Sequence, residues 1–259
     1  MKTFKKDFEK FRSMLVNNIP FAFARYSDGE LFILQNKQLK LDHGVVQVGD
    51  DITRVNMYQK QDHKHFDPNE HQYTRQKLIE SIQFKFPNYY KGISCKCCVG
   101  EESFNEQIML NGGSVEDLTW SNLFVNSNYP LFLKEIVPLI GTKKVVMVCH
   151  HDADLQQLKK CLVKDFRVGY NAMVNDIDKI SLIKDWIEEN KITDHLFLFS
   201  ASTFSNLAIY ELFKFCNLNT YIDIGTCLAP HTKMPCQRSY LMEYFYNTAG
   251  NDLKKTCIW

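Results

Sequence analysis

Short apolar runs and longer segments with helical spacing of apolar residues alternate along the second half of the chain. The runs predict strands and the spaced segments predict helices. From residue 144 we expect, in order, strand 144–150, helix 154–163, strand 166–170, helix 177–190, strand 195–200, helix 204–215 and strand 220–224. Strands that alternate with helices over short connections are typical of a doubly wound parallel sheet. The pattern therefore predicts an α/β fold with a Rossmann-like, mostly parallel sheet.

The first half of the chain is less regular. Its apolar spacing predicts an amphipathic helix over 1–16, a buried strand over 21–25 and a short helix over 30–36. Further elements are expected at 45–48 (strand), 73–86 (helix), 92–99 (strand) and 130–139 (helix), with a polar loop over 50–71. We expect residues 1–259 to form a single domain, in which 143–226 are the regular half and 227–259 a C-terminal extension.

Candidate chemistry begins where the first strand ends, in the segment Arg25-Tyr26-Ser27-Asp28-Gly29-Glu30. Asp28 and Glu30 are two residues apart, so in an extended segment they project to the same side. Two such carboxylates repel each other, and a hard divalent cation such as Mg²⁺ or Mn²⁺ relieves that repulsion. Gly29 lacks a Cβ and allows a sharp turn or the close approach of a ligand. The alternative is a strand-to-helix turn in which Asp28 caps the helix and Glu30 interacts with its dipole.

Polar residues also follow the strands of the regular half. They are His150 with His151 and Asp152, Asn171, Ser200 with Ser202 and Thr203, and Asp223 with Gly225. Ligands of open α/β sheets bind beyond the carboxyl ends of the strands, so we expect these residues to meet at one site. Ser202 and Thr203 stand where a helix begins and can hold a phosphate, although each also suits an N-cap. The sequence has no Gly-x-Gly-x-x-Gly and no Walker loop, which disfavours a dinucleotide cofactor or ATP.

These two groups of residues resemble the motifs of a known family. The segment Arg25–Glu30 resembles the signature of the GT-D-type glycosyltransferases, a bacterial family first catalogued as a domain of unknown function. Members carry an Arg-aromatic-Gly-Asp-Gly-Glu segment near the N-terminus, and Ser27 stands here in place of the first glycine. Asn171-Ala172, Ser200-Ala201-Ser202-Thr203 and Asp223-Ile224-Gly225-Thr226 are similar to the family's Asn-Ala, Gly-Pro-Thr-Ala and Asp-Ile-Gly-His segments. Thr226 replaces the family histidine, with His231 nearby in sequence.

The resemblance implies a metal-dependent glycosyltransferase with a GT-D-like fold. Such an enzyme moves a sugar from a nucleotide donor, here expected to be a UDP-sugar, to a hydroxyl of a glycan, glycolipid or glycoprotein. The resemblance assigns Asp28 and Glu30 to the metal, Mn²⁺ or Mg²⁺, and to the donor diphosphate. Arg25 would pair with the phosphates or fix the carboxylates, and a carboxylate would deprotonate the acceptor in an inverting reaction. The expected nucleotide site lies between the turn at Asp28 and the strand ends at His150, Asn171, Ser200 and Asp223.

Two other classes of function are compatible with the sequence. A Rossmann-like module that binds a nucleotide or sugar without turnover is favoured by Thr226 in place of the histidine and by Ser200-Ala201 in place of Gly-Pro. A methyltransferase built on the regular half, with His150 and Asp152 near the cofactor, ranks lower because a glycine-rich first loop is lacking.

Composition and charge limit the partners and the cellular compartment that we expect for the protein. With 31 Lys and Arg, 30 Asp and Glu and a net charge of +1, nothing favours a nucleic-acid or anionic-membrane surface. No apolar stretch follows the first lysines and no window has the length of a membrane helix, so we expect a cytoplasmic protein without a secretory signal. The nine cysteines lack a disulfide-scaffold spacing and are expected to be thiols. Both a monomer and an oligomer are compatible with the sequence.

Three local clusters have a plain and a functional interpretation. Cys95-Lys96-Cys97-Cys98 lacks a partner pair at zinc-ligand spacing, and alternation along a strand would make Cys95 and Cys97 small apolar residues. His63 and His65 suit a metal, but their polar neighbours favour a solvated loop, with a mobile lid as the alternative. The asparagines and aromatics of Trp120–Tyr129 suit a sugar, or equally a cap and loop before the next helix.

Overall fold

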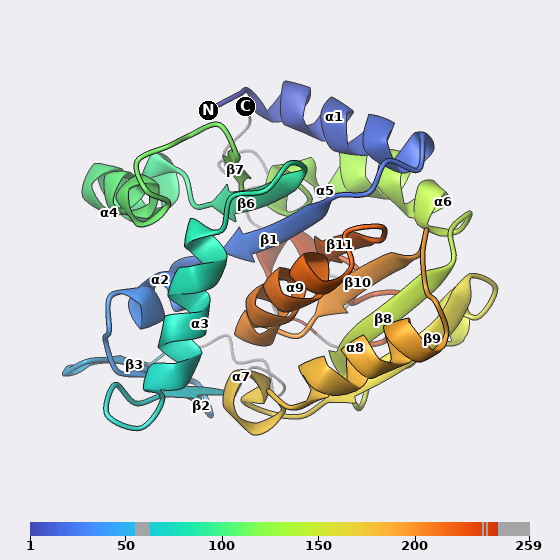
Figure 1. The fold of residues 1–259 in the computed structure, drawn as a ribbon. Coiled ribbons are helices and arrows are strands. Elements are labelled where there is room, and N and C mark those ends of the chain that lie inside the picture. Colours follow the sequence, from blue (N-terminus) through green and yellow to red (C-terminus); the bar gives the residue numbers. More distant parts are fainter. Residues whose placement is uncertain (55–62, 235, 237, 243–259) are drawn as a thin grey trace.

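A computed structural model of the protein describes residues 1–54, 63–234, 236 and 238–242. Its centre is a sheet of seven strands, all parallel, in the order β7-β6-β1-β11-β10-β8-β9 (Figure 1). The strands are β1 (Ala22–Tyr26), β6 (Tyr89–Ile93), β7 (Leu118–Trp120), β8 (Val145–His150), β9 (Leu162–Val168), β10 (Leu196–Ser200) and β11 (Thr220–Asp223). The α/β class and the parallel sheet predicted from the sequence are confirmed.

β1 and β11, the first and last strands of this sheet in the order of the sequence, lie side by side. β1 pairs with β11 in parallel, with Ala22 opposite Tyr221 and Phe23 opposite Ile222, and β6 pairs with the other edge of β1. This pairing places the end of β1, where the Asp28 segment begins, next to the end of β11, where Asp223 lies. Residues from opposite ends of the sequence therefore share one edge of the sheet.

Helices cover both faces of the sheet, and alternate residues of β1 pack against the two layers. Phe23 belongs to the hydrophobic cluster of α1, α5 and α6, whereas Ala22 and Ala24 belong to the cluster of α2, α3, α8 and α9 (Figure 1). The helices are α1 (Phe4–Val16), α2 (Asp28–Leu34), α3 (Gln72–Gln83), α4 (Lys96–Leu110), α5 (Tyr129–Leu131), α6 (Val137–Ile140), α7 (Ala172–Asn175), α8 (Lys179–Glu189) and α9 (Thr203–Phe215). A strand buried on both faces is apolar at nearly every position, which is why the runs of the second half are continuous rather than alternating.

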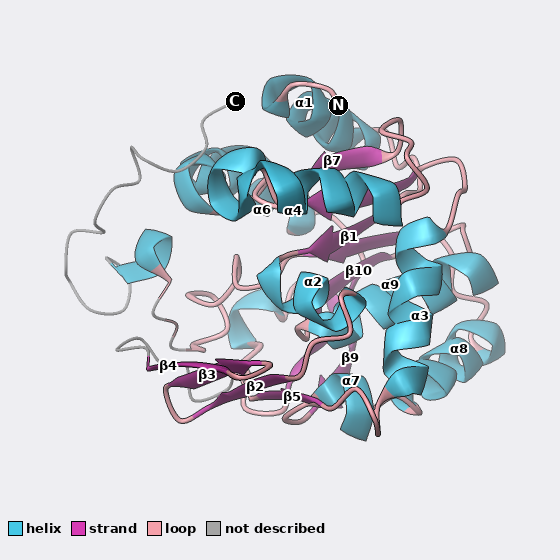
Figure 2. Ribbon diagram, turned by 90° about the vertical axis from the view of Figure 1, so that its left-hand side faces the viewer, coloured by secondary structure: helices cyan, strands magenta, loops and turns pink. Residues whose placement is uncertain are grey.

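A second, antiparallel sheet lies apart from the main one, with α2 between them (Figure 2). Its order is β4-β3-β2-β5, and the strands are β2 (Leu39–Asp42), β3 (Val45–Val48), β4 (Asp51–Arg54) and β5 (Lys64–Phe66). The strand at 45–48 was predicted, but the loop predicted over 50–71 is wrong at β4 and β5; residues 55–62 lie outside the described part of the chain. Many residues of this small sheet are half-buried, and pairing of backbone groups holds its strands together.

The strand predicted at 92–99 is also misplaced. It lies earlier, as β6, and the cysteine segment that follows begins α4 instead. Lys91 concealed the strand, because a lysine inside an apolar run argues against burial. Its ammonium is buried nevertheless, and it donates a hydrogen bond to Asn111 Oδ1 (2.9 Å) and pairs with Asp117.

No α-helix connects β8 to β9, although the apolar spacing of 154–163 predicted one. The segment holds a single 3₁₀ turn, Gln156–Leu158, and β9 begins at Leu162. Arg167 on β9 instead holds the turn that follows β8, because its Nη1 donates to the carbonyls of His150 (3.3 Å), His151 (3.4 Å) and Ala153 (2.7 Å). The other predicted helices and strands of this half are confirmed within a few residues at their ends.

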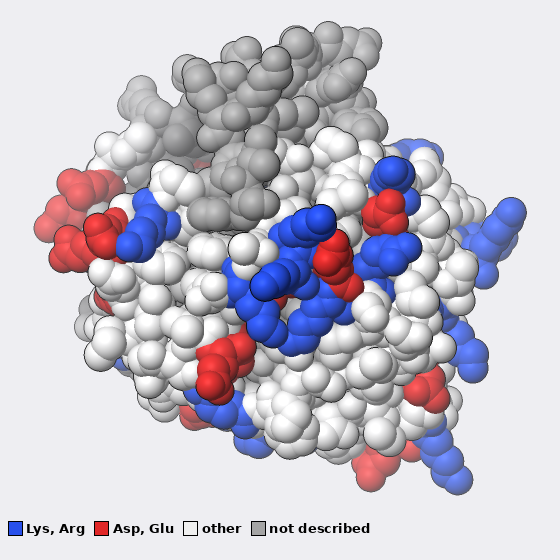
Figure 3. Space-filling view, turned by 90° about the horizontal axis from the view of Figure 1, so that it is seen from above, with Lys and Arg blue, Asp and Glu red and all other residues white. Residues whose placement is uncertain are grey.

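The face around α1 carries both signs of charge side by side (Figure 3). Two ion pairs on α1 illustrate this: Lys5 lies 3.9 Å from Glu9, and Arg12 lies 3.0 Å from Glu135. Within the described residues, none of the helices combines the length and the apolar character needed to span a membrane.

Candidate active site

The carboxyl ends of the parallel strands open into a cleft of about 660 Å³. All the residues proposed for the site from the sequence line it: Arg25, Asp28, Gly29, Glu30, His150, Asn171, Ser200, Ser202, Thr203, Asp223 and Gly225. They come from β1, α2 and the ends of β8, β9, β10 and β11. The structure thus brings the two groups of motifs together in one place.

Glu30 is buried in the wall of the cleft and has partners on both carboxylate oxygens. Oε1 accepts hydrogen bonds from Lys64 Nζ (3.1 Å) and Thr203 Oγ1 (2.5 Å), and Oε2 accepts one from the Ser27 N–H (3.0 Å). Burial alone would raise the pKa of Glu30, but the Lys64 charge and these hydrogen bonds outweigh it and hold the pKa below the usual value. Glu30 is therefore a carboxylate at neutral pH.

Asp28 and Glu30 are not on an extended segment, so the argument that they project to one side is wrong. Ser27 is the N-cap of α2, Asp28 is its first residue, and Glu30 reaches back to the Ser27 N–H as in a capping box. Asp28 remains exposed at the cleft. Desolvation by the cleft wall and then the charge of Glu30 raise the pKa of the Asp28 carboxyl. Capping is thus performed by Ser27 and Glu30, which leaves Asp28 facing the cleft.

Lys64 is a site residue that sequence reasoning missed. It lies on β5 of the second sheet, and its ammonium reaches Glu30 across the cleft. A Cβ at Gly29 would come within 2.7 Å of Lys64 Nζ, so the group that approaches this glycine closely is the lysine. The sequence signal for this strand was one polar residue, His65, followed by one apolar residue, Phe66, and this alternation is too short to predict a strand.

Asn171 fixes β5 in position. Its side-chain Nδ2 donates to the His65 carbonyl (3.1 Å), its Oδ1 accepts from the His65 N–H (3.0 Å), and its own N–H donates to the His63 carbonyl (3.2 Å). The backbone of Asn171 is left-handed, with φ +49°, a conformation that asparagine tolerates better than most residues. The side-chain amide thus holds the strand that carries Lys64, and Asn171 also lines the cleft.

Arg25, Asp223 and Gly225 form a second charged cluster. Arg25 Nε donates to the Ser121 carbonyl (2.7 Å), and Asp223 Oδ1 accepts from the Gly225 N–H (2.9 Å). Burial raises the pKa of Asp223 to about 6, although Arg25 and the Gly225 N–H counteract it. Gly225 has φ +50°, and a Cβ there would overlap Arg25 Nη1. Glycine is required here for both reasons.

The start of α9 forms the floor between these clusters. Ser202 has φ +53° and precedes the helix, and Asn206 Nδ2 donates to the Arg25 carbonyl (2.7 Å), which ties α9 to β1. The hydroxyl of Thr203 is engaged by Glu30. At this helix start, Ser200 and Ser202 line the cleft beside the amides of the first turn.

His150, His151 and Asp152 place three groups of metal-ligand type within 4.8 Å of one another, and His150 is the member of this group that lines the cleft. Burial and then the neighbouring His151 lower the pKa of His150, so it is a neutral imidazole. Its Nδ1 accepts from the Asp152 N–H (3.2 Å), and its buried Nε2 has no hydrogen-bond partner among the described residues. This group and the Asp28–Glu30 pair each offer ligands that suit a hard or borderline cation.

The segment Trp120–Tyr129 divides its residues between core and cleft. Trp120, Phe124 and Tyr129 are buried and pack in the hydrophobic core, so they are not exposed platforms for a sugar ring. Asn122 and Asn126 line the cleft. The aromatic residues therefore fit the structural interpretation and not a sugar-binding role. Asn122 and Asn126 remain available to the hydroxyls of a ligand.

The sequence left open the roles of Thr226, of His231, and of His63 in the second sheet. Thr226 lines the cleft, and its hydroxyl lies 2.5 Å from the Tyr240 hydroxyl. His231 is not among the residues of the cleft. His63 Nδ1 lies 2.9 Å from Asp42 Oδ1, on the side of the second sheet. Tyr240, rather than a histidine, therefore occupies the space next to position 226.

No protein-family model and no curated protein matches the chain. Solved structures do. One, described as the highly conserved domain of unknown function 1792 with a distinct glycosyltransferase fold, matches with a TM-score of 0.53 and 11% identity, over 93% of this chain and 81% of that chain. A selenomethionine-substituted structure of domain 1792 gives a TM-score of 0.52 at 11% identity over the same shares.

A third solved structure, described as a new glycosyltransferase of this domain type from Streptococcus sanguinis, gives a TM-score of 0.51 and 13% identity, over 85% of this chain and 80% of that chain. The protein therefore has a Rossmann-like glycosyltransferase fold. It is the fold of domain 1792, and the resemblance inferred from the motifs is confirmed at the level of the fold.

Proposed function

We propose that the protein is a metal-dependent glycosyltransferase that moves a sugar from a nucleotide-sugar donor, with UDP as the expected nucleotide, to a hydroxyl of a glycan. The observation that carries this proposal is the convergence of Asp28, Glu30, Lys64 and Arg25 with the start of α9 in one cleft. That cleft lies at the edge of the sheet where α/β folds bind ligands.

The acidic pair fits a divalent cation in a particular way. Each carboxylate oxygen offers about two lone pairs, so Glu30 Oε1, with two donors, is filled, whereas Oε2 has one donor. Asp28 lies exposed on the cleft, and its raised pKa reflects a site in which added positive charge is favourable. Asp28 would therefore hold Mn²⁺ or Mg²⁺ directly, with Glu30 contributing through Oε2 or a water. When bound, the metal would neutralise charge on the leaving diphosphate.

The remaining residues bind and orient the donor. Arg25 and Lys64 supply fixed positive charge for the phosphates, and the amides and hydroxyls at Ser200 and Ser202 offer hydrogen bonds. Glu30 keeps Lys64 aimed into the cleft through the 3.1 Å contact. Asn122 and Asn126 are placed to bind sugar hydroxyls. The donor diphosphate would then lie between the start of α2 and the start of α9.

Donor hydrolysis tests this proposal without knowledge of the acceptor. UDP-, GDP- and TDP-sugars are incubated with the protein over a range of Mn²⁺ concentrations, and free sugar is measured. Asp28→Asn is expected to keep the fold, because Ser27 is the N-cap, and to lower Mn²⁺-dependent hydrolysis by roughly 100-fold. The exposed Glu101, which lies outside the cleft, provides the control variant Glu101→Gln, which should keep the wild-type rate.

Glu30→Gln extends the test. Because Glu30 balances Lys64 and accepts from Thr203, its loss should lower both hydrolysis and the melting temperature, whereas Asp28→Asn should lower hydrolysis alone. If both variants keep wild-type rates and the same metal dependence, the proposed site is wrong.

A module that binds a nucleotide or sugar without turnover is the second candidate. The observation in its favour is Thr226, whose hydroxyl is engaged with Tyr240 at the position of the family histidine. Calorimetry distinguishes the two functions. Tight binding of UDP or a UDP-sugar with no hydrolysis or transfer at any Mn²⁺ concentration would support the module.

A further inference from the structure

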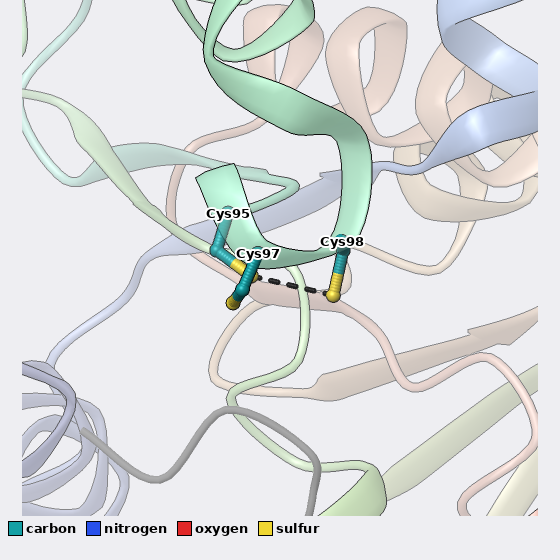
Figure 4. Close-up of side chains that lie close together, drawn as sticks. All are labelled: Cys95, Cys97 and Cys98. Carbon is teal, nitrogen blue, oxygen red and sulfur yellow. Dashed lines mark hydrogen bonds between the residues drawn. The ribbon is translucent and has the colours of Figure 1, made fainter.

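Three thiols lie together at the edge of the cleft, where α4 begins. Sγ of Cys95 is 2.8 Å from Sγ of Cys97 and 3.3 Å from Sγ of Cys98, and all three sulfurs lie within 4.8 Å of one another (Figure 4). Cys95 is buried, whereas Cys97 and Cys98 are exposed. Cys95 and Cys98 also line the cleft, so the cluster borders the space in which a ligand would lie.

The backbone of this segment explains the convergence. Cys95 is the N-cap of α4, and its carbonyl accepts from the N–H groups of Cys98 (3.0 Å) and Val99 (3.2 Å). Gly100, with φ +81°, then interrupts the helix. The result is one isolated turn that carries the three cysteines, rather than the strand along which they would have alternated.

A buried glutamine, Gln107, holds the residue that precedes this turn. Gln107 Oε1 accepts from the Ser94 N–H (2.9 Å), and Gln107 Nε2 donates to the Ser94 carbonyl (3.3 Å). Gln107 is only 1% exposed, so both hydrogen bonds are shielded from water. The residue that precedes the thiols is therefore held on both of its backbone polar groups, which fixes the start of the turn.

We propose that Cys95, Cys97 and Cys98 form a binding site for one thiophilic d¹⁰ cation, of which Zn²⁺ is the representative. Thiolates are the preferred ligands of such ions. Zn–S bonds of about 2.3 Å in tetrahedral geometry place sulfurs roughly 3.8 Å apart. The present separations of 2.8 and 3.3 Å are shorter, so the sulfurs must open slightly, and the exposed side chains of Cys97 and Cys98 can do so.

Within the described part of the chain the site has three protein ligands, and a tetrahedral ion would take its fourth ligand from water or from a molecule in the cleft. The sequence argument against zinc rested on the lack of a second pair of Cys or His ligands. A zinc site with three protein ligands does not require such a second pair. Binding converts three thiols to thiolates and releases up to three protons for each Zn²⁺ taken up, so affinity should increase with pH.

The experiment uses the full, reduced chain, freed of metal and titrated with Co²⁺ and then with Zn²⁺. We expect one equivalent of Co²⁺ to produce a thiolate-to-metal charge-transfer band and Zn²⁺ to displace it. Zn²⁺ should also protect Cys95, Cys97 and Cys98 from alkylation, read by mass spectrometry. None of these readouts involves donor turnover, so the outcome is independent of the proposed glycosyltransferase function.

Matched double variants identify the ligands. Cys97→Ser with Cys98→Ser changes two exposed side chains and should weaken Zn²⁺ binding by at least about 100-fold without a large change in melting temperature. Cys161→Ser with Cys216→Ser, two partly buried thiols elsewhere, should bind as the wild type does. Equal affinities in the two double variants, or no charge-transfer band in the wild type, would overturn the proposal. So would a Cys95–Cys98 disulfide that resists reduction and excludes the metal.

Discussion

Lys64 and Glu30 form an ion pair that joins the two sheets of the protein across the cleft. Nζ of Lys64 lies 3.1 Å from Oε1 of Glu30, and the two side chains are 12% and 8% exposed. Lys64 belongs to the antiparallel sheet, and Glu30 belongs to α2, the helix that follows β1 of the parallel sheet. The charge balance of the cleft therefore depends on where β5 lies.

Lys64→Met should destabilise the protein at pH 7 by about 3 kcal/mol, because it leaves a buried carboxylate without its cation. The pKa of Glu30 is lowered in the folded protein, so the stabilisation is present above its unfolded value of about 4.5 and is lost as the pH falls through the folded value. Urea unfolding should show the gap between wild type and variant narrowing towards pH 4. Lys64→Arg keeps the charge and serves as control; a gap that is the same at both pH values would contradict the assignment.

Asn171→Gly should loosen β5 and leave the backbone of residue 171 unstrained, because glycine adopts its φ of +49° freely. The variant loses two hydrogen bonds to His65, worth about 2 kcal/mol together. Amide hydrogen exchange should rise in Lys64–Phe66 and in Leu39–Asp42, with which β5 pairs. Asn18→Gly, at another left-handed asparagine (φ +52°), should leave exchange in these strands unchanged.

Gly225→Ala should cost far more stability than Gly112→Ala. Both glycines have positive φ (+50° and +74°), so each alanine carries about 1–2 kcal/mol of backbone strain. Only at Gly225 would the new Cβ overlap Arg25, whereas nothing lies within 4 Å of the Cβ position at Gly112. The overlap should add roughly 1–3 kcal/mol and weaken nucleotide binding by moving Arg25. Thermal melts and calorimetry of the two variants measure the difference; similar melting temperatures would mean that Arg25 moves aside freely.

Asp223→Asn should change how stability depends on pH. The pKa of Asp223 is raised to about 6 from 3.8, so its favourable contribution is complete below about pH 4 and is lost as the pH rises through 6. The variant lacks this loss, so its stability relative to wild type should increase between pH 4 and pH 7 by up to about 3 kcal/mol. Urea unfolding at several pH values measures this, with the exposed Asp185→Asn as control. A relative stability that does not vary with pH would show that Asp223 is not perturbed.

Local patterns predicted most elements of the second half and, in the first half, α1, β1, α2, β3 and α3. β10, α9 and β11 follow apolar runs and helical spacing, which are properties of neighbouring residues. β6 and the segment between β8 and β9 were misread for one reason. Lys91 is buried because Asp117 and Asn111 approach it, and Arg167 binds the carbonyls of His150, His151 and Ala153 directly before 154–163. Partners that are distant in the sequence overrode the local preference in both cases.

That the polar strand ends share one edge follows from the sequence pattern alone, because parallel strands necessarily align their carboxyl ends. The pattern therefore predicted that the strand-end residues between Arg25 and Gly225 line the cleft, although it missed Lys64. What those side chains contact became clear only from the folded chain: Glu30 with Lys64, Thr203 with Glu30, Asn171 with His65, and the three thiols with one another. The physical reason is that these contacts depend on how β5 docks against the end of β9 and on where one turn of α4 breaks. The position of β5 and the interruption of α4 are set by hydrogen bonds between and within segments. The local spacing of apolar residues does not encode the geometry of these hydrogen bonds.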